Sequence, residues 1–250
     1  MAGAHVRRVL RGLPRDANTP AMIVSHEHKF IFLKTRKTAG TSVELALSAI
    51  CGPEDIITPV SERDEAMRQG RGPQNWDVNF NPWWKTQARR VGLFSKGRKH
   101  RGHYYNHMTS AEAKARLGDA VWRRYFKFAI ARNPWDRQVS FYRWRTKTAE
   151  TPMPFAEFMA SERRARRNNH EVFMIGGALA VDALVRYEAL ANDLAAALAQ
   201  AGVTQPLNLP RAKAVASSEK RPYREYYTGE TRARVAAWYA PEIAAAGYEF

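Results

Sequence analysis

The sequence has almost no cysteine, since Cys51 is the only one in its 250 residues. A single cysteine excludes an internal disulfide, and it excludes a metal site built from several thiolates. Long apolar runs are also missing: no stretch approaches the ~20 residues that a membrane-spanning helix needs. Residues 1–20 carry arginines but no continuous apolar segment before Pro14, which is not typical of a secretory signal. These absences predict a cytoplasmic protein without a transmembrane segment.

Acidic residues are scarce relative to basic ones. The chain has 40 Lys and Arg against 24 Asp and Glu, which gives a formal net charge of +16. Such an excess favours anionic partners, either polyanions or small phosphorylated molecules. The hydrophobic content of 45% and the aromatic content of 11% are typical of a globular protein. We expect a single domain over residues 1–250, with residues 1–20 as a loose N-terminal arm.

Alternating strand and helix signals predict an α/β fold with a central parallel sheet flanked by helices. Phe30–Leu33 and Tyr125–Ala131 are short apolar runs typical of buried strands. A helical pattern follows each of them, over Thr41–Ile50 and Pro134–Lys147. The remaining predicted elements are a helix over 109–124 that opens on a capping box and pauses near Gly118, a strand at 185–187, a helix over 190–201 capped by Gly202, and a helix over 231–239 halted at Pro241.

The junction after the first strand has the composition of an anion-binding loop. Here a strand feeds a turn that contains Gly40 and then a helix, whose first N–H groups lack intrahelical partners. Thr41 and Ser42 supply hydroxyl groups, and Lys37 supplies a mobile positive charge. The order differs from the nucleotide-hydrolase loop, in which lysine follows the last glycine, because Lys37 precedes Gly40 by three residues. The alternative is a basic turn whose hydroxyls only cap the helix.

A second basic cluster follows the second strand. Arg132 lies where that strand ends, and Ser140 follows it by eight residues, inside the next helix. In a parallel sheet both junctions open onto the carboxyl edge, where α/β proteins bind their ligands. Arg132 could hold a phosphate together with Ser140. The alternative pairs Arg132 and Arg137 with Asp136 or with glutamates, and leaves Ser140 on the helix surface.

These two clusters together resemble the sulfotransferases that use 3′-phosphoadenosine 5′-phosphosulfate (PAPS), and specifically the carbohydrate-type family 2. The resemblance lies in KTAGTS and FAIARNPWDRQVSFY, and it extends to HMTSAEAKARLGDAVWRRYF, VDALVRYEAL and the C-terminal segment from Lys220. It covers most of the chain from Phe30 onward, is weak over 53–100 and is absent from the N-terminal arm. The resemblance implies a P-loop-like three-layer sandwich, a sulfuryl transfer that needs no metal, and 3′,5′-adenosine bisphosphate as the product.

The resemblance also implies roles for individual residues. Lys37 would stabilise the leaving group, and the 3′-phosphate would be held by Arg132 and Ser140. The residues implied at the 5′-phosphosulfate are Lys37, Thr38, Ala39, Gly40, Thr41 and Ser42, and those of a late loop closing over the ligand are Ser217, Lys220 and Arg221.

A histidine is expected to act as the base for the acceptor hydroxyl. His107 precedes the helix start as in the family pattern, and His103 is the second candidate, because related enzymes carry a histidine in a neighbouring loop. Both could instead be loop residues with ordinary partners.

Residues 53–102 are expected to be an insertion on the acceptor side. Trp76, Trp83 and Trp84 could stack on a sugar ring, although clustered tryptophans more often pack a satellite core. The arginine-rich segment 163–167 is either a solvated helix face or a grip for an acidic substrate. The predicted acceptor is a hydroxyl-bearing carbohydrate or glycoconjugate, and an acidic glycan or a lipid-linked acceptor is compatible. Because eukaryotic relatives that modify glycans usually carry a membrane anchor, the sequence favours a bacterial enzyme.

Two other functions are compatible with parts of the sequence. A kinase-like phosphotransferase could use a related loop, but the loop order and the lack of a strand ending in a Mg²⁺-binding aspartate disfavour it. A basic nucleic-acid-binding module would fit the net charge of +16. A module of that kind would be expected to carry its cations along one helix, whereas the cations of this chain gather where strands meet helices. We therefore expect no nucleic-acid partner.

Overall fold

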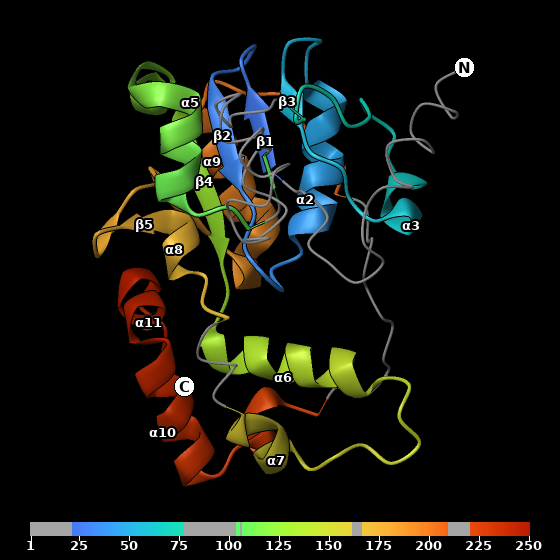
Figure 1. Ribbon diagram of the computed structural model, residues 1–250, viewed down its shortest axis with the longest axis vertical. Coiled ribbons are helices and arrows are strands. Elements are labelled where there is room, and N and C mark those ends of the chain that lie inside the picture. Colours follow the sequence, from blue (N-terminus) through green and yellow to red (C-terminus); the bar gives the residue numbers. More distant parts are fainter. Residues whose placement is uncertain (1–21, 78–103, 106, 162–166, 210–220) are drawn as a thin grey trace, which may run out of the picture.

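The computed structural model describes residues 22–77, 104–105, 107–161, 167–209 and 221–250. At its centre a five-stranded sheet is covered by helices on both faces (Figure 1). The strands run in the order β3–β1–β2–β4–β7. Their bounds are β1 (Met22–Ser25), β2 (Phe30–Leu33), β3 (Ile56–Ile57), β4 (Phe126–Ala131) and β7 (Ala183–Arg186). This is the α/β layered architecture that the sequence predicts.

The helices that the sequence predicts are present, with bounds within about three residues of those expected. Thr109 and Glu112 form the expected capping box of α5, and Gly118 interrupts that helix with φ 80° and ψ 158°. Pro241 does not end the helical region, because it lies in the first turn of a further helix, α11, where its missing N–H group costs nothing. The helices and remaining strands are α2 (Gly40–Leu47), η1 (Ser48–Ile50), α3 (Glu62–Glu65), α5 (Ser110–Arg124), α6 (Pro134–Thr146), α7 (Phe155–Ala160), α8 (His170–Phe173), β5 (Met174–Ile175), β6 (Ala178–Leu179), η3 (Tyr187–Ala189), α9 (Leu190–Gln200), η4 (Tyr223–Tyr226), α10 (Gly229–Trp238) and α11 (Ala240–Ala246).

The half of the sheet that carries the two basic junctions is parallel. β2 pairs with β4, with Phe32 opposite Phe128, and β4 pairs with β7, with Ala131 opposite Arg186. The carboxyl ends of these three strands therefore open on one edge. In the other half, a tight turn after Ser25 sends the chain back antiparallel to β1 as β2, and β3 also pairs antiparallel with β1. The sheet is thus mixed, and not parallel throughout.

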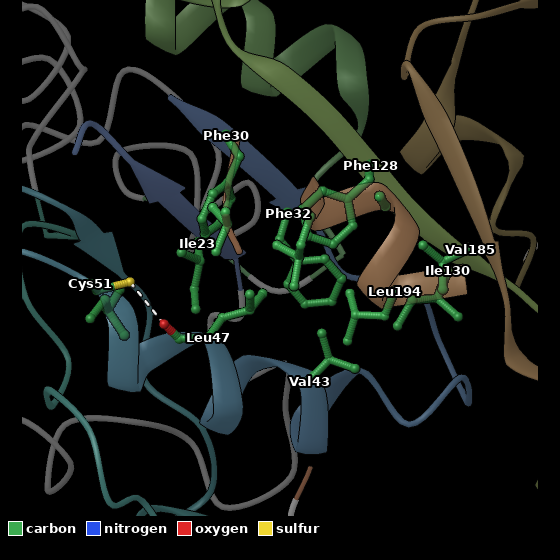
Figure 2. Packing of buried hydrophobic residues seen from close by; sticks show 14 residues of the cluster. Ile23, Phe30, Phe32, Val43, Leu47, Cys51, Phe128, Ile130, Val185 and Leu194 are labelled. Atoms are coloured by element: carbon green, nitrogen blue, oxygen red, sulfur yellow. Dashed lines mark hydrogen bonds between the residues drawn. The ribbon is translucent and has the colours of Figure 1, made fainter. Parts of the chain in front are cut away.

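Alternate residues of the strands face two separate apolar cores. Phe30 and Phe32 of β2 pack toward α2 and α9, and the ring of Phe32 stacks on that of Phe128 at 5.3 Å (Figure 2). Ile31 and Leu33, which point to the opposite face, pack toward α5 and α8. This alternation is the period of two that a strand imposes on its side chains. It makes the sheet the middle layer of three.

A third apolar cluster lies beyond the carboxyl edge of the sheet. It joins α6, α7 and α10 through Trp135, Phe155, Val235 and Tyr239, all buried. Figure 1 shows α6 crossing below the strands, directly after β4. The cluster thereby fixes α6 next to the end of the sheet at which the basic junctions open.

Candidate active site

The loop between β2 and α2 holds two residues other than glycine in the left-handed conformation. Lys37 has φ 62° and Ala39 has φ 57°, values that side-chain-bearing residues adopt uncommonly. Gly40 itself begins α2, and a Cβ added there would lie 2.6 Å from Cγ of Lys34. Gly40 is therefore required because the Lys34 side chain passes close to the start of the helix. A close approach of this kind is one of the reasons for a glycine.

Two of the loop's cations interact with other parts of the protein. Nζ of Lys34 lies 3.0 Å from Oε2 of Glu44, and both side chains are buried. Burial raises the pKa of the Glu44 carboxyl, while Lys34 opposes that shift. Arg36 donates from Nη1 to the carbonyl of Asn168 at 3.2 Å, and burial together with the charge of Arg167 lowers the pKa of Arg36. Lys34 thus belongs to an internal ion pair.

The loop hydroxyls differ in their surroundings. Thr38 is fully buried, with its Oγ1 2.8 Å from that of Thr35, which in turn donates to the carbonyl of Ile130 in β4 at 2.5 Å. Thr41 and Ser42 lie in the first turn of α2 and are nearly buried. The N-cap residue of α2 is Ala39, which has no side-chain acceptor to offer. The start of this helix is thus suited to an external anion.

Arg132, at the end of β4, contacts this loop directly. Its Nη1 donates to the carbonyl oxygen of Lys37 at 2.8 Å. Its Nε and Nη2 lie 2.8 Å and 2.7 Å from Oδ2 of Asp136, and its guanidinium stacks on the ring of Tyr187 at 4.1 Å. The ion pair with Asp136 is the one that the alternative interpretation expected. The contact with Lys37 brings the two basic junctions together.

The side chain of Lys37 lies against α6. Its Nζ is 5.7 Å from the ring centroid of Phe141 and 5.6 Å from that of Trp144. Ser140 immediately precedes Phe141 in this helix and is half-buried. The Lys37 ammonium, Arg132 and the helix that carries Ser140 therefore meet at the carboxyl edge.

His107 lies at the same edge. Its Nδ1 is 2.8 Å from the carbonyl oxygen of Lys34, the residue that follows β2. Because a carbonyl oxygen only accepts, Nδ1 carries the proton of this hydrogen bond. In the neutral ring Nε2 is then the nitrogen that can accept a proton.

The late loop is described only at its end. Ser217 and Lys220 lie outside the described residues, as does His103. Arg221 accepts a hydrogen bond on its carbonyl oxygen from Nη2 of Arg143 in α6 at 2.6 Å, and its Nε lies 3.1 Å from Glu225. The chain therefore leaves this loop beside α6.

Comparison with known families decides the identity of the chain. The family model described as "Sulfotransferase family" matches residues 20–243, which is most of the sequence. The chain belongs to the sulfotransferase family. No curated protein sequence matches it. A solved structure, the crystal structure of a sulfotransferase from Alicyclobacillus acidocaldarius, is similar at 18% sequence identity and a TM-score of 0.42, covering 89% of this chain and 96% of that one.

The sulfotransferase contains a buried polar network that was not predicted from its sequence. Arg137 is fully buried and donates from Nη2 to Oε1 of Glu242 at 3.1 Å. The N–H group of Asn169 donates to the same oxygen at 2.5 Å. Arg137 and Glu242 are 105 residues apart, so no local pattern could have paired them. The sequence indicated one part of this network, because the alternative interpretation of the second basic cluster paired Arg137 with a carboxylate.

The acceptor side of the sulfotransferase is described in part. Trp76 packs against the core on the α5 face of the sheet, as the packing interpretation expected. Trp83 and Trp84 lie outside the described residues, and so does most of the arginine-rich segment 163–167. Within the ranges that the structure covers, no group of three or more His, Cys, Asp or Glu residues could hold a metal ion. In the same ranges, no helix is long and apolar enough to cross a membrane.

Proposed function

We propose that this sulfotransferase takes PAPS as its donor and moves the sulfuryl group to an acceptor hydroxyl by in-line displacement, leaving 3′,5′-adenosine bisphosphate. The observation that carries the proposal is the contact between Arg132 and the carbonyl of Lys37. It joins cations from two parallel strand ends at the edge where α/β sheets bind ligands. A nucleotide with an anionic group at each of its two ends would suit this pair of cations.

The 5′ end of the donor is assigned to the loop and the start of α2. The helix has no side-chain N-cap, so its first N–H groups and its partial positive charge favour a phosphate. The residues assigned to this end are Lys37, Thr38, Ala39, Gly40, Thr41 and Ser42. Arg132 and Ser140 are assigned to the 3′-phosphate, and the late loop, with Ser217, Lys220 and Arg221, is assigned to closure over the nucleotide.

Lys37 is proposed to stabilise the leaving group. When bound, PAPS supplies an activated sulfuryl group whose bridging oxygen becomes more negative as transfer proceeds. An ammonium on a flexible four-carbon stem can follow that charge. Lys37 Nζ lies near the rings of Phe141 and Trp144, at the edge of the sheet where the donor is proposed to bind.

His107 is proposed to act as the base. Its hydrogen bond to the carbonyl of Lys34 places the ring proton on Nδ1, so in the neutral ring Nε2 is the nitrogen that would take the proton of the attacking hydroxyl. His103 is the second candidate for this role. The acceptor is proposed to be a carbohydrate or glycoconjugate hydroxyl, with residues 53–102 forming the acceptor side.

The test is PAPS-dependent transfer of radiolabelled sulfate to a panel of glycans, lipids and small alcohols. The wild-type protein is expected to label at least one acceptor, and Lys37→Ala to label none. His107→Ala is expected to lower turnover by about 10²–10⁴-fold, the typical contribution of a general base. His28→Ala is the matched control, since His28 is half-buried and its Nε2 also lies 3.0 Å from a main-chain carbonyl.

Near-normal turnover of a folded His107→Ala protein would contradict the base assignment. A wild-type protein that binds neither PAPS nor 3′,5′-adenosine bisphosphate would contradict the donor assignment.

A further inference from the structure

The conformation of Lys37 has to be imposed by its surroundings. A lysine at φ 62° lies in a region that few side-chain-bearing residues occupy. Such residues persist where neighbouring groups fix the backbone, and they concentrate at functional sites. Contacts that fix this conformation act on the two peptide groups that flank Lys37.

Both flanking carbonyls accept hydrogen bonds from side chains. The carbonyl that follows, that of Lys37 itself, accepts from Arg132 at 2.8 Å. The carbonyl that precedes, that of Arg36, accepts from Nδ2 of Asn169 at 3.1 Å. The Oδ1 atom of Asn169 also accepts from the N–H group of Arg36 at 2.9 Å. One amide side chain thus holds both polar groups of Arg36.

Asn169 is itself held in place through its main-chain N–H group. It is 1% exposed, and its N–H group donates to Oε1 of Glu242 at 2.5 Å. Glu242 forms the buried ion pair with Arg137 of α6, and Arg137 stacks on the ring of Tyr239 at 4.7 Å. The chain of contacts runs from the loop through Asn169 to the helix that carries Ser140. The loop and α6 are therefore held in one arrangement.

We propose that Asn169 is a positioning residue for Lys37. The carbonyl of Arg36 belongs to the peptide plane that ends at the nitrogen of Lys37, so a bond at this carbonyl fixes the plane about which φ of Lys37 turns. Asn169 fixes the plane before Lys37 and Arg132 fixes the plane after it. The two contacts thereby set the direction in which the Lys37 side chain leaves the loop, and its Nζ lies against Phe141 and Trp144 of α6. The proposal depends on the proposed function, in which Lys37 meets the 5′ end of the donor.

A double-mutant cycle with 3′,5′-adenosine bisphosphate as the probe tests this role. Affinity is measured by calorimetry on four proteins: wild type, Asn169→Asp, Lys37→Ala and the double variant. Asn169→Asp keeps an acceptor for Arg36 N–H but loses the donor to its carbonyl, so the affinity is expected to fall about tenfold in the wild-type background. Because Asn169 acts through Lys37, the same substitution is expected to change affinity by less than about twofold in the Lys37→Ala background.

The matched control is Asn75→Asp. Asn75 donates from Nδ2 to the carbonyls of Pro53 and Asp55, each at 3.0 Å, and it also has a positive φ of 54°. Asn75 lies on the proposed acceptor side and not among the residues assigned to the nucleotide, so the same chemical change there is expected to leave the affinity for the bisphosphate unchanged. If Asn169→Asp does not give folded protein, Asn169→Ser replaces it, since its short hydroxyl cannot span both polar groups of Arg36, and the same two expectations apply.

Two results would overturn the positioning role: wild-type affinity in the Asn169 variant, or an equal loss in both backgrounds, which is what a merely structural residue would give. A wild-type protein that does not bind the probe would overturn the proposed function, and this proposal with it. Binding by the wild type with no coupling to Lys37 would overturn the positioning role alone.

Discussion

The guanidinium of Arg132 donates a hydrogen bond to the main-chain carbonyl of Lys37 at 2.8 Å, although the two residues are 95 positions apart in the chain. Arg132 directly follows β4 and Lys37 follows β2, and these strands are parallel neighbours. Nε and Nη2 of Arg132 lie 2.8 Å and 2.7 Å from Oδ2 of Asp136. Arg132 therefore serves the loop and an internal carboxylate together, and a bound phosphate would share its positive charge with that carboxylate.

Replacing Asp136 is expected to improve the binding of a 3′-phosphate. In Asp136→Asn the charge of Arg132 loses its internal partner, so the affinity for 3′,5′-adenosine bisphosphate should rise about threefold to tenfold by calorimetry. Stability should fall by about 0.5–1 kcal/mol, because an acid is lost from the first turn of α6 together with a partly exposed ion pair.

The matched control for Asp136→Asn is Glu230→Gln. Glu230 also lies in the first turn of a helix, α10, and pairs with Arg234 four residues later at 2.7 Å. The control should not change the affinity. A loss of affinity in Asp136→Asn would mean that Asp136 orients Arg132 for the phosphate and does not compete with it.

Glu242→Ala is expected to destabilise the protein strongly. It leaves the fully buried Arg137 without its carboxylate, and an arginine cannot shed its charge. Removing one partner of a buried ion pair typically costs about 3–5 kcal/mol, measurable by urea unfolding. Glu225→Gln is the comparison, since the Glu225–Arg221 pair is more than half exposed and should contribute little. A cost for Glu242→Ala near that of the comparison would contradict the role given to the network.

The thiol of Cys51 is expected to be unreactive in the native protein. Burial raises the pKa of this thiol, and its Sγ donates to the carbonyl of Leu47 at 3.3 Å (Figure 2). A raised pKa leaves less of the reactive thiolate at pH 8. An aromatic disulfide reagent should therefore label the native chain only slowly, and label one thiol per chain at once in guanidinium chloride. Immediate labelling without denaturant would show that Cys51 is accessible.

The parts of the fold that local signals determine were predictable from the sequence. Phe30–Leu33 and Tyr125–Ala131 are apolar runs with helical patterns after them, and they form β2 and β4 within one residue of the expected bounds. The capping box at Thr109 and the break at Gly118 also lie where the sequence places them. Each of these features depends on residues that are close in the chain.

Features that depend on distant residues were not predictable. β1 pairs antiparallel with β2, although its sequence resembles that of the strands in the parallel half. The contacts of Asn169 with Arg36 and with Glu242 join polar residues 133 and 73 positions apart, and polar residues carry no periodic pattern. At the site, the sequence indicated that Lys37 and Arg132 share one edge of the sheet, but not that Arg132 contacts the main chain of the loop.

The most direct test of the proposed function measures how the protein discriminates between 3′,5′-adenosine bisphosphate and 5′-AMP by calorimetry. If Lys37 and Arg132 hold opposite ends of one nucleotide, the wild type should bind the bisphosphate at least about tenfold more tightly, and Arg132→Ala should lose most of that ratio. Equal affinities in the wild type, or a ratio that survives in a folded Arg132→Ala protein, would contradict it.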